Sequence, residues 1–482
     1  MTFRLTRTLF IAAALPLVSA FSLLIAAAGA SAASATSQTD LAAAVRLRDT
    51  ALRSDVAFGV VESLTTEVGP RPAGSAGDAA AVDWAVRKLT ELGFANVHTQ
   101  GVAVPHWVRG VSEFSVITPF PQNMPSLAIG GSIATPDEGL RAEAIKVLNL
   151  EELRALPAER VKGKIVFYTQ RTERTRDGSG YGRAVRVRGG GASAAAAMGA
   201  VGVVIREIST GNNRLPHTGA LIYDAAQPRI PAIAIANPDA DALERQFATG
   251  RVVTLQMKVT ARDLPTAHSA NVIGEIPGTD KANEIVLLGA HLDSWDPGTG
   301  AIDDGAGIAI IVGAARLLRD VDPKPRRTVR VVLFANEEFG GSGSKAYAAA
   351  AVPDIDKHVL AMEADLGAGP VWRIQSHVAE ADLPWVRQIQ KIVAPLGVTI
   401  GENQTQGGSD VAPLHALGVP LLGLNLDATE YFDHHHSAND TLDKVDPAKL
   451  RQSVAVYAVA AYLATRVETT LGRVSVVPTP AR

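Results

Sequence analysis

The sequence predicts an α/β protein with a mostly parallel central sheet and an inserted β-rich segment. From Ser269 onward, short apolar runs alternate with helical patterns, which is typical of a sheet covered by helices. These apolar runs are nearly continuous, which favours buried parallel strands. Between residues 120 and 262 the pattern changes to short apolar runs with one Ala-rich stretch. This change indicates a small β-rich domain inserted into a larger one.

The first predicted elements precede the insert. Apolar residues recur at helical spacing over 40–64 and 77–93, with a turn-rich Gly-Pro-Arg-Pro stretch between them. The next strand is expected over 95–104. Inside the insert, a helix is expected at 192–198 and strands are expected at 144–148, 164–168, 201–205 and 232–235. We interpret Arg188-Gly189-Gly190-Gly191 as a flexible turn, because it lacks the Lys and Ser/Thr of a phosphate-binding loop.

Strands and helices alternate after the insert. The expected strands are 284–290, 328–335, 359–364 and 419–424, and the expected helices are 305–318, 383–394 and 446–468. The main domain is therefore expected to combine residues 40–119 with 263–470. A C-terminal tail at 471–482 would follow it.

The N-terminus has the pattern of an export signal. Arg4 and Arg7 precede an apolar stretch over 9–30, and the small residues Ala30-Ser31-Ala32 follow. We expect a signal peptide over 1–32, cleaved near Ala32-Ala33, and a periplasmic or secreted protein without a stable membrane span. An uncleaved anchor would also fit, because about 22 largely apolar residues nearly span a bilayer.

Composition excludes several classes of protein. A chain of 482 residues that is 47% hydrophobic is not disordered. Its formal net charge of −3 gives no support for a nucleic-acid partner. The chain has no Cys, which excludes disulfides, thiolate metal sites and a Cys nucleophile. Any transition metal must be held by His, Asp or Glu.

Metal-ligand residues gather at the ends of the predicted strands. Ligand sites in open α/β sheets lie outside the carboxyl ends of the strands, so these separate clusters are expected to converge. Each cluster alone is more typical of a surface pair, a turn or a helix cap, but their joint occurrence in this order predicts a two-metal centre. The residues concerned are His291, Asp293, Asp303, Asp304, Glu337, Glu338, Asp365 and the run His434-His435-His436.

These residues suggest distinct roles. We expect Asp303 to bridge two metals, with His291 and Asp365 on one ion and with Glu338 and His436 on the other, although the three consecutive histidines are chemically equivalent on paper. Glu337 is left to act as general base on a metal-bridging water. Asp293 is expected to accept the second ring N–H of His291.

The order of these motifs resembles the co-catalytic zinc aminopeptidase and glutamate carboxypeptidase family. The last motif, His436-Ser437-Ala438-Asn439-Asp440-Thr441, selects His436 over its two neighbours through that resemblance. The resemblance covers about residues 60–463. Within the family it points to the plasma glutamate carboxypeptidase subgroup, through stretches at 68–75, 105–110, 216–219 and 291–296.

The resemblance implies a phosphorylase/hydrolase-like α/β/α catalytic domain with two zinc ions, for which Co²⁺ or Mn²⁺ are substitutes. It assigns the ligand roles to His291, Asp303, Glu338, Asp365 and His436 and the base role to Glu337. It also implies a protease-associated insert over 120–262 and a cis peptide after Asp303. The stretch Asp433-His434-His435 departs from the subgroup, whose members tend to have an aromatic residue and a single His there.

The expected activity is hydrolysis of dipeptides or short peptides with a free terminus. Ser409, Asp410 and Tyr431 are candidates for substrate binding at the cleft rim. The sequence is compatible with a homodimer and does not distinguish carboxypeptidase, dipeptidase and broader aminopeptidase activity. A single-zinc glutaminyl cyclase-like enzyme is disfavoured by His291, and a non-catalytic receptor-like protein is disfavoured by the complete ligand set.

Overall fold

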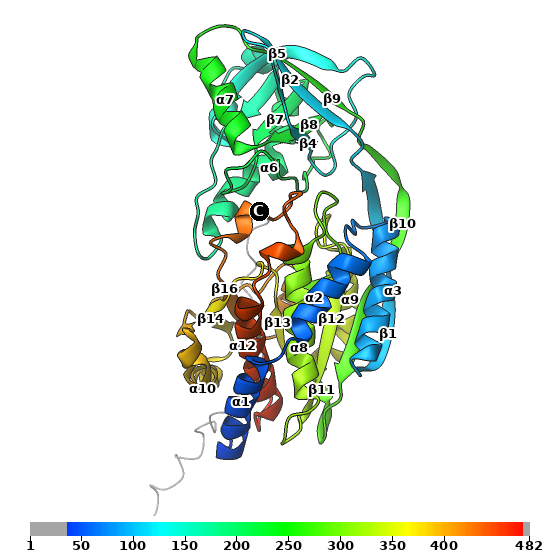
Figure 1. Cartoon of the computed structure of the whole chain (residues 1–482), viewed down its shortest axis with the longest axis vertical. Helices are drawn as coiled ribbons and strands as arrows, with labels where there is room; N and C mark the ends of the chain where they lie inside the picture. Colours follow the sequence, from blue (N-terminus) through cyan, green and yellow to red (C-terminus); the bar gives the residue numbers. More distant parts are fainter. Residues whose placement is uncertain (1–35, 476–482) are drawn as a thin grey trace, which may run out of the picture.

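The computed structural model describes residues 36–475, which form two eight-stranded sheets (Figure 1). The first sheet and most helices occupy the lower part of the view, and the second sheet lies above them. The predicted signal peptide at 1–32 and residues 476–482 of the predicted tail lie outside the described residues. No helix of the described part is long and apolar enough to cross a membrane.

The first sheet has a parallel centre and antiparallel flanks. Its strand order is β1-β10-β12-β11-β13-β16-β14-β15, and the four strands from β12 to β16 run parallel to one another. β10 pairs antiparallel with both of its neighbours. The strands are β1 (Ala95–Val108), β10 (Arg262–Ile276), β11 (Lys281–His291), β12 (Arg327–Phe334), β13 (His358–Glu363), β14 (Val371–His377), β15 (Thr399–Ile400) and β16 (Leu421–Leu426).

Helices cover both faces of this sheet. Alternate side chains of each central strand point to opposite faces, so Val286 of β11 joins the core beneath α8 and α12 while Leu287 joins the core beneath α9 and α11. This arrangement is an α/β/α sandwich. The helices are α1 (Gln38–Ala51), α2 (Val56–Glu67), α3 (Ala76–Glu91), α8 (Ala306–Leu318), α9 (Ser342–Ala351), α10 (Leu383–Val393), α11 (Ala412–Ala416) and α12 (Pro447–Arg466).

The predicted helix over 40–64 is two helices, α1 and α2. The first helix ends at Ala51, and Asp55 is the N-cap of the second. Ser54 and Asp55 favour caps and turns, because their short polar side chains bond to nearby backbone groups. The predicted strands of the main domain are all present, whereas β10 was not predicted, because its first half is polar and mostly exposed.

The second sheet lies between β1 and β10 in the chain. Its strand order is β3-β2-β9-β5-β6-β7-β8-β4. It begins at Ser112, so β2 belongs to it although these residues precede 120. The elements are β2 (Ser112–Thr118), β3 (Gln122–Met124), β4 (Ser126–Ala128), β5 (Leu140–Val147), β6 (Ile165–Tyr168), β7 (Gly202–Arg206), β8 (Ala232–Ile235), β9 (Thr254–Val259), α4 (Leu150–Arg154), α5 (Ala158–Val161), α6 (Ser179–Ala197) and α7 (Asn237–Ala248).

Helix α6 faces the first sheet, above the orange chain segment that precedes α12 (Figure 1). It includes the Arg188–Gly191 stretch, so the predicted flexible turn there is wrong. A Cβ on Gly191 would lie 3.0 Å from the ring of Tyr168, whose hydroxyl donates to the Gly191 carbonyl at 3.0 Å. Close packing on the sheet therefore outweighs the low helix propensity of glycine here.

Candidate metal centre

Polar side chains lie at or just after the carboxyl ends of three parallel strands of the first sheet. His291 is the last residue of β11, Glu337 and Glu338 follow β12, and Asp365 follows β13. Strands β12, β11 and β13 are neighbours and run parallel, so their carboxyl ends meet. This is the edge where sites form in open α/β sheets.

Asp303 lies between two groups of ligand atoms. Its Oδ1 is 3.1 Å from Nε2 of His291, and its Oδ2 is 3.1 Å from Nε2 of His436. Asp365 completes the first group with Oδ1 3.7 Å from His291, and Glu338 completes the second with Oε2 3.0 Å from His436. Within each group, the potential ligand atoms all lie within 4.8 Å of one another. One carboxylate is thus shared by two three-residue groups.

The turn that carries Asp303 is fixed by its neighbour. The Asp303–Asp304 peptide is cis, as the family resemblance implies. The Asp304 carboxylate is fully buried and accepts the backbone N–H groups of His291 and Gly307, both at 3.1 Å. These bonds tie the turn to the end of β11 and to the start of α8.

The two groups are buried and acidic, and no Lys or Arg of the described residues pairs with their carboxylates. His291 is 1% exposed and Asp303 is 4% exposed. Oε1 of Glu338 is buried without a hydrogen-bond donor. Unpaired buried carboxylates are costly, and imidazole with carboxylate is a donor set that zinc accepts. The residues therefore fit a pair of divalent metal ions.

The histidine pKa values agree with a strongly negative site. Burial alone would lower the pKa of His291, but its contacts with Asp293, Asp303 and Asp365 outweigh burial and raise that pKa well above its usual value. For His436, contacts with Glu338 and Asp303 likewise outweigh the effect of burial and raise the pKa well above its usual value. Such a potential favours a bound cation.

Glu337 lies beside the first group. Burial, together with the negative charges of Asp365 and Glu338, raises its pKa to about 8. The side chain of Ser409 hydrogen-bonds to it. A carboxyl group whose pKa lies near neutrality next to ligand atoms is suited to general base chemistry.

Asp293 makes a different contact from the one we expected. The atom nearest to Nδ1 of His291 is the backbone carbonyl oxygen of Asp293, at 3.0 Å, whereas the carboxylate is 3.7 Å away. The carboxylate instead accepts the backbone N–H groups of Glu337 at 2.9 Å and Glu338 at 3.3 Å. Asp293 thus holds the Glu-Glu pair in place, because its side chain turns toward the end of β12.

Only one of the three consecutive histidines faces Asp303. His435 stacks against His436, with 4.3 Å between ring centroids, and also packs on Phe432. Nδ1 of His434 is 3.3 Å from the side-chain amide of Asn439. His436 alone contributes to the ligand groups, because the turn after Phe432 directs its two neighbours away from Asp303.

Sequence reasoning missed three contacts that hold these ligands. The indole N–H of Trp295 donates to Oε2 of Glu338 at 2.6 Å. The carbonyl oxygen of Thr218, from the second sheet's segment, lies 3.3 Å from Nδ1 of His436. Arg71 is fully buried and donates to the carbonyls of the loop before Asp303. Trp295, Thr218 and Arg71 all fall in stretches that support the family resemblance, which is the only sequence signal for them.

The three predicted substrate-binding residues lie near Glu337 or His435 but differ in exposure. Ser409 is exposed, whereas Asp410 is 1% exposed and neither of its carboxylate oxygens has a hydrogen-bond partner. Glu363 explains this burial, because its carboxylate accepts the N–H groups of Asp410 at 2.9 Å and of the next residue at 2.8 Å, drawing the loop inward. Tyr431 is buried, with its ring 4.9 Å from that of His435. Asp410 and Tyr431 are therefore buried, whereas Ser409 is exposed.

Arg188 of α6 reaches the same site. Its buried guanidinium lies over the ring of Tyr181, 5.5 Å from the centroid. Its Nη1 is 3.2 Å from the carbonyl oxygen of Thr218 and 3.4 Å from Nδ1 of His436. No carboxylate of the described residues pairs with it, and its Nε has no hydrogen-bond partner. A buried cation without an acidic partner, next to a metal-ligand group, is suited to binding an anion.

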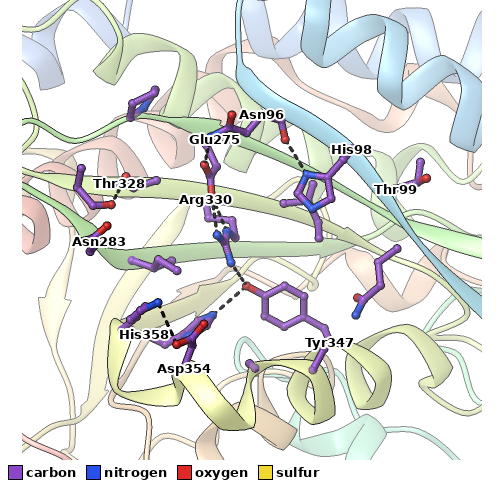
Figure 2. A pocket seen from close by; sticks show the side chains of 18 residues that line it. Asn96, His98, Thr99, Glu275, Asn283, Thr328, Arg330, Tyr347, Asp354 and His358 are labelled. Carbon is purple, nitrogen blue, oxygen red and sulfur yellow. Dashed lines mark hydrogen bonds and ion pairs between the residues drawn. The ribbon is translucent and has the colours of Figure 1, made fainter.

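A cavity of about 650 Å³ lies away from this edge (Figure 2). It is lined by residues at the start of the parallel strands, such as Thr328 and His358, whereas the ligand groups lie at the strand ends. Arg330 donates to Glu275 and to the Tyr347 hydroxyl, and that hydroxyl bonds to His358 at 2.9 Å. None of the residues that line this cavity belongs to the two candidate ligand groups.

Comparisons with known proteins agree with this geometry. The model of peptidase family M28 matches residues 271–461. Carboxypeptidase Q of Rattus norvegicus is 35% identical over 410 residues, which cover 85% of each chain. The solved structure of a peptidase M28 precursor from Shewanella amazonensis SB2B has 46% identity and a TM-score of 0.89, covering 91% of this chain and 99% of that one. A solved zinc aminopeptidase from Bacillus subtilis has 22% identity and a TM-score of 0.61, covering 85% of this chain and 94% of that one.

The chain therefore belongs to peptidase family M28. The predicted class of enzyme, a zinc-dependent metallo-exopeptidase, is confirmed at the level of the family. The predicted subgroup is also confirmed, because carboxypeptidase Q is another name for plasma glutamate carboxypeptidase.

Proposed function

We propose that the protein is a di-zinc exopeptidase that hydrolyses dipeptides or short peptides with a free terminus. One observation carries the di-zinc part: the two oxygens of Asp303 lie at equal distances, 3.1 Å, from the imidazoles of two separate ligand groups. A carboxylate so placed suits two ions ~3.5–4 Å apart. His291 and Asp365 would complete one site, and Glu338 and His436 the other.

The zinc ions, when bound, would supply Lewis-acid polarisation of the scissile carbonyl and a lower pKa for the attacking water. Glu337 takes the proton of that water on its carboxylate and passes it to the leaving amine. Ser409 bonds to the Glu337 side chain, and Asp293 fixes its backbone, so the base is held from both sides. Glu337 and Asp293 are thus the catalytic and positioning residues of this proposal.

The substrate end of the proposal rests on Arg188. A free α-carboxylate on the substrate would neutralise the positive charge of this guanidinium, which has no acidic partner in the described part of the chain. The relatives' names include both carboxypeptidase and aminopeptidase, and recognition of a carboxylate favours dipeptidase or carboxypeptidase activity.

The remaining predictions concern organisation. We propose that the segment centred on 120–262 is a protease-associated insert, supported by its separate sheet and by the contacts of α6 with the ligand groups. Residues 40–119 and 263–470 would then form the catalytic domain. Export with a cleaved signal peptide remains our proposal for localisation, supported by the pattern of residues 1–32.

A hydrolysis assay tests this function. Purified zinc-loaded protein is incubated with a panel of dipeptides, their N-acetyl forms and their C-terminal amides. We expect hydrolysis of free dipeptides that chelator abolishes and zinc restores. Cleavage confined to internal bonds of long peptides, or activity insensitive to chelator, would overturn the proposal.

A further inference from the structure

Asp433 lies three residues before His436, a member of the second candidate ligand group. Its carboxylate receives a two-pronged ion pair from Arg174, with Nη2 2.6 Å from Oδ1 and Nη1 2.9 Å from Oδ2. The hydroxyl of Thr210 also donates to Oδ1 at 2.7 Å. Arg174 and Thr210 both belong to the segment of the second sheet, so these bonds join the two sheets' segments.

Backbone contacts continue this connection toward the ligand. The N–H of Thr210 donates to the carbonyl of Phe432 at 3.1 Å, and the N–H of Thr218 donates to the carbonyl of His436 at 2.9 Å. His436 has a φ of 60°, a left-handed conformation that a non-glycine residue rarely adopts. The segment 210–218 therefore lies along the turn 432–436 and bonds to both of its ends.

The orientation of the ligand ring depends on the same segment. If Nε2 of His436 faces the metal group, its Nδ1–H faces the carbonyl oxygen of Thr218, 3.3 Å away. Outer hydrogen bonds of this kind fix the tautomer and the ring direction of a metal-ligating histidine, and losing them typically lowers metal affinity 10–100-fold. Any contact that keeps segment 210–218 against the turn thus contributes to the ligand geometry.

We propose that Asp433, through Arg174 and Thr210, is a positioning residue that holds His436 in its ligand position. This inference rests on the proposed di-zinc function. Exposed ion pairs usually contribute little to stability. A two-pronged guanidinium–carboxylate pair within a network is an exception, because its geometry makes it stronger. The second sheet's segment therefore positions one of the two candidate ligand groups. The group of His291 and Asp365 does not depend on these contacts.

The chain offers a matched control for this ion pair. Arg176 pairs with Asp427 at 2.8 Å and connects the same two segments, with side-chain exposures of 52% and 23%, compared with 42% and 21% for Arg174 and Asp433. Asp427 lies nine residues before His436 instead of three. Arg176→Ala removes an ion pair of similar exposure between the same two segments without changing a contact of the turn.

Zinc titration of the metal-free protein tests the proposal. The variant His436→Ala identifies which binding step belongs to the second group. We expect Asp433→Ala and Arg174→Ala each to lower the zinc affinity of the second group about tenfold and to leave the affinity of the first group unchanged. In the double variant, the two effects are expected to be non-additive. Equal weakening of both steps, no weakening, or the same weakening in Arg176→Ala would overturn the proposal.

A second measurement separates this inference from the di-zinc function. Amide hydrogen exchange of the peptide covering 429–437 is followed in the metal-free proteins, with thermal unfolding as the folding control. We expect faster exchange in Asp433→Ala and Arg174→Ala and unchanged exchange in Arg176→Ala. Unchanged exchange in all three overturns the positioning role, whereas a wild-type chain that binds one zinc ion overturns the proposed function alone.

Discussion

Trp295 donates its indole N–H to Oε2 of Glu338 at 2.6 Å. Trp295 also lies edge-on to His436, with 5.9 Å between ring centroids. One aromatic side chain therefore contacts both the carboxylate and the histidine of the second candidate ligand group. Outer contacts of this kind direct the first ligand shell of a metal.

The variant Trp295→Phe removes that hydrogen bond and keeps an aromatic ring. We expect the affinity for the second zinc ion to fall about tenfold, because Glu338 loses the donor that fixes its orientation. A chelator competition assay measures this affinity. Trp107→Phe is a suitable control, since the Trp107 indole donates to the carbonyl of Ser132 instead of a ligand. An unchanged second affinity in Trp295→Phe would show that the bond does not position Glu338.

Glu337→Gln tests the general base. The amide fills the same space but accepts no proton, so we expect kcat to fall about 100- to 10,000-fold while zinc content stays at the wild-type value. The measurement pairs a dipeptide assay with metal analysis of the same sample. Turnover within a few-fold of wild type would remove Glu337 from the base role, and loss of zinc would make it a ligand.

Arg188→Met tests recognition of the substrate carboxylate. Losing one partner of a buried, hydrogen-bonded charge pair costs roughly 2 kcal/mol or more, so we expect kcat/KM for a free dipeptide to fall at least about thirtyfold. The C-terminal amide of the same dipeptide is the internal control, and its hydrolysis is expected to change little. Equal losses for the two substrates would show that Arg188 has a structural role.

Glu207 makes the stability of the second sheet's segment dependent on pH. Burial raises its pKa to about 8 from an ordinary value of 4.5, although it accepts the N–H groups of Asn237 and His217. Between these two pH values the unfolded chain releases a proton that the folded chain keeps. The free energy of unfolding therefore falls as the pH rises through this window.

We expect Glu207→Gln to remove this pH-dependent part of the free energy of unfolding. At pH 8 the free energies of unfolding of the two proteins are expected to differ by at most a few kcal/mol from this effect, because one pKa unit corresponds to about 1.4 kcal/mol. Urea unfolding of both proteins at pH 5 and pH 8 measures it. The prediction fails if the two proteins lose the same stability between these pH values.

The parallel core of the fold was predictable because its strands are apolar on both faces. β11 from Ile285 onward, β12 and β13 are almost entirely buried, so their sequences are nearly continuous apolar runs. β10 was missed, because it is polar where it pairs only with β1 and apolar where it also pairs with β12. The helical Gly189–Gly191 stretch was missed for a related reason, since packing on Tyr168 is not visible in local propensity.

The convergence of the predicted ligand residues was predictable, because each of them ends an apolar run or belongs to a motif of fixed order. Contacts made by the second sheet's segment were not. Thr218 and Arg188 lie more than 200 residues from His436 in the chain, and neither has a local pattern that indicates a role. The burial of Asp410 was not predictable, because it depends on Glu363, whose carboxylate accepts two backbone N–H groups of the loop.

Zinc stoichiometry is the decisive test of the proposed two-metal centre. Metal-free protein is titrated with zinc and analysed for bound metal after gel filtration, for the wild type and for Asp303→Ala. We expect about two zinc ions per wild-type chain, because Asp303 belongs to both ligand groups. We expect the variant to lose tight binding at both sites. One zinc ion per wild-type chain, or a variant that loses a single ion and keeps the other at full affinity, would contradict it.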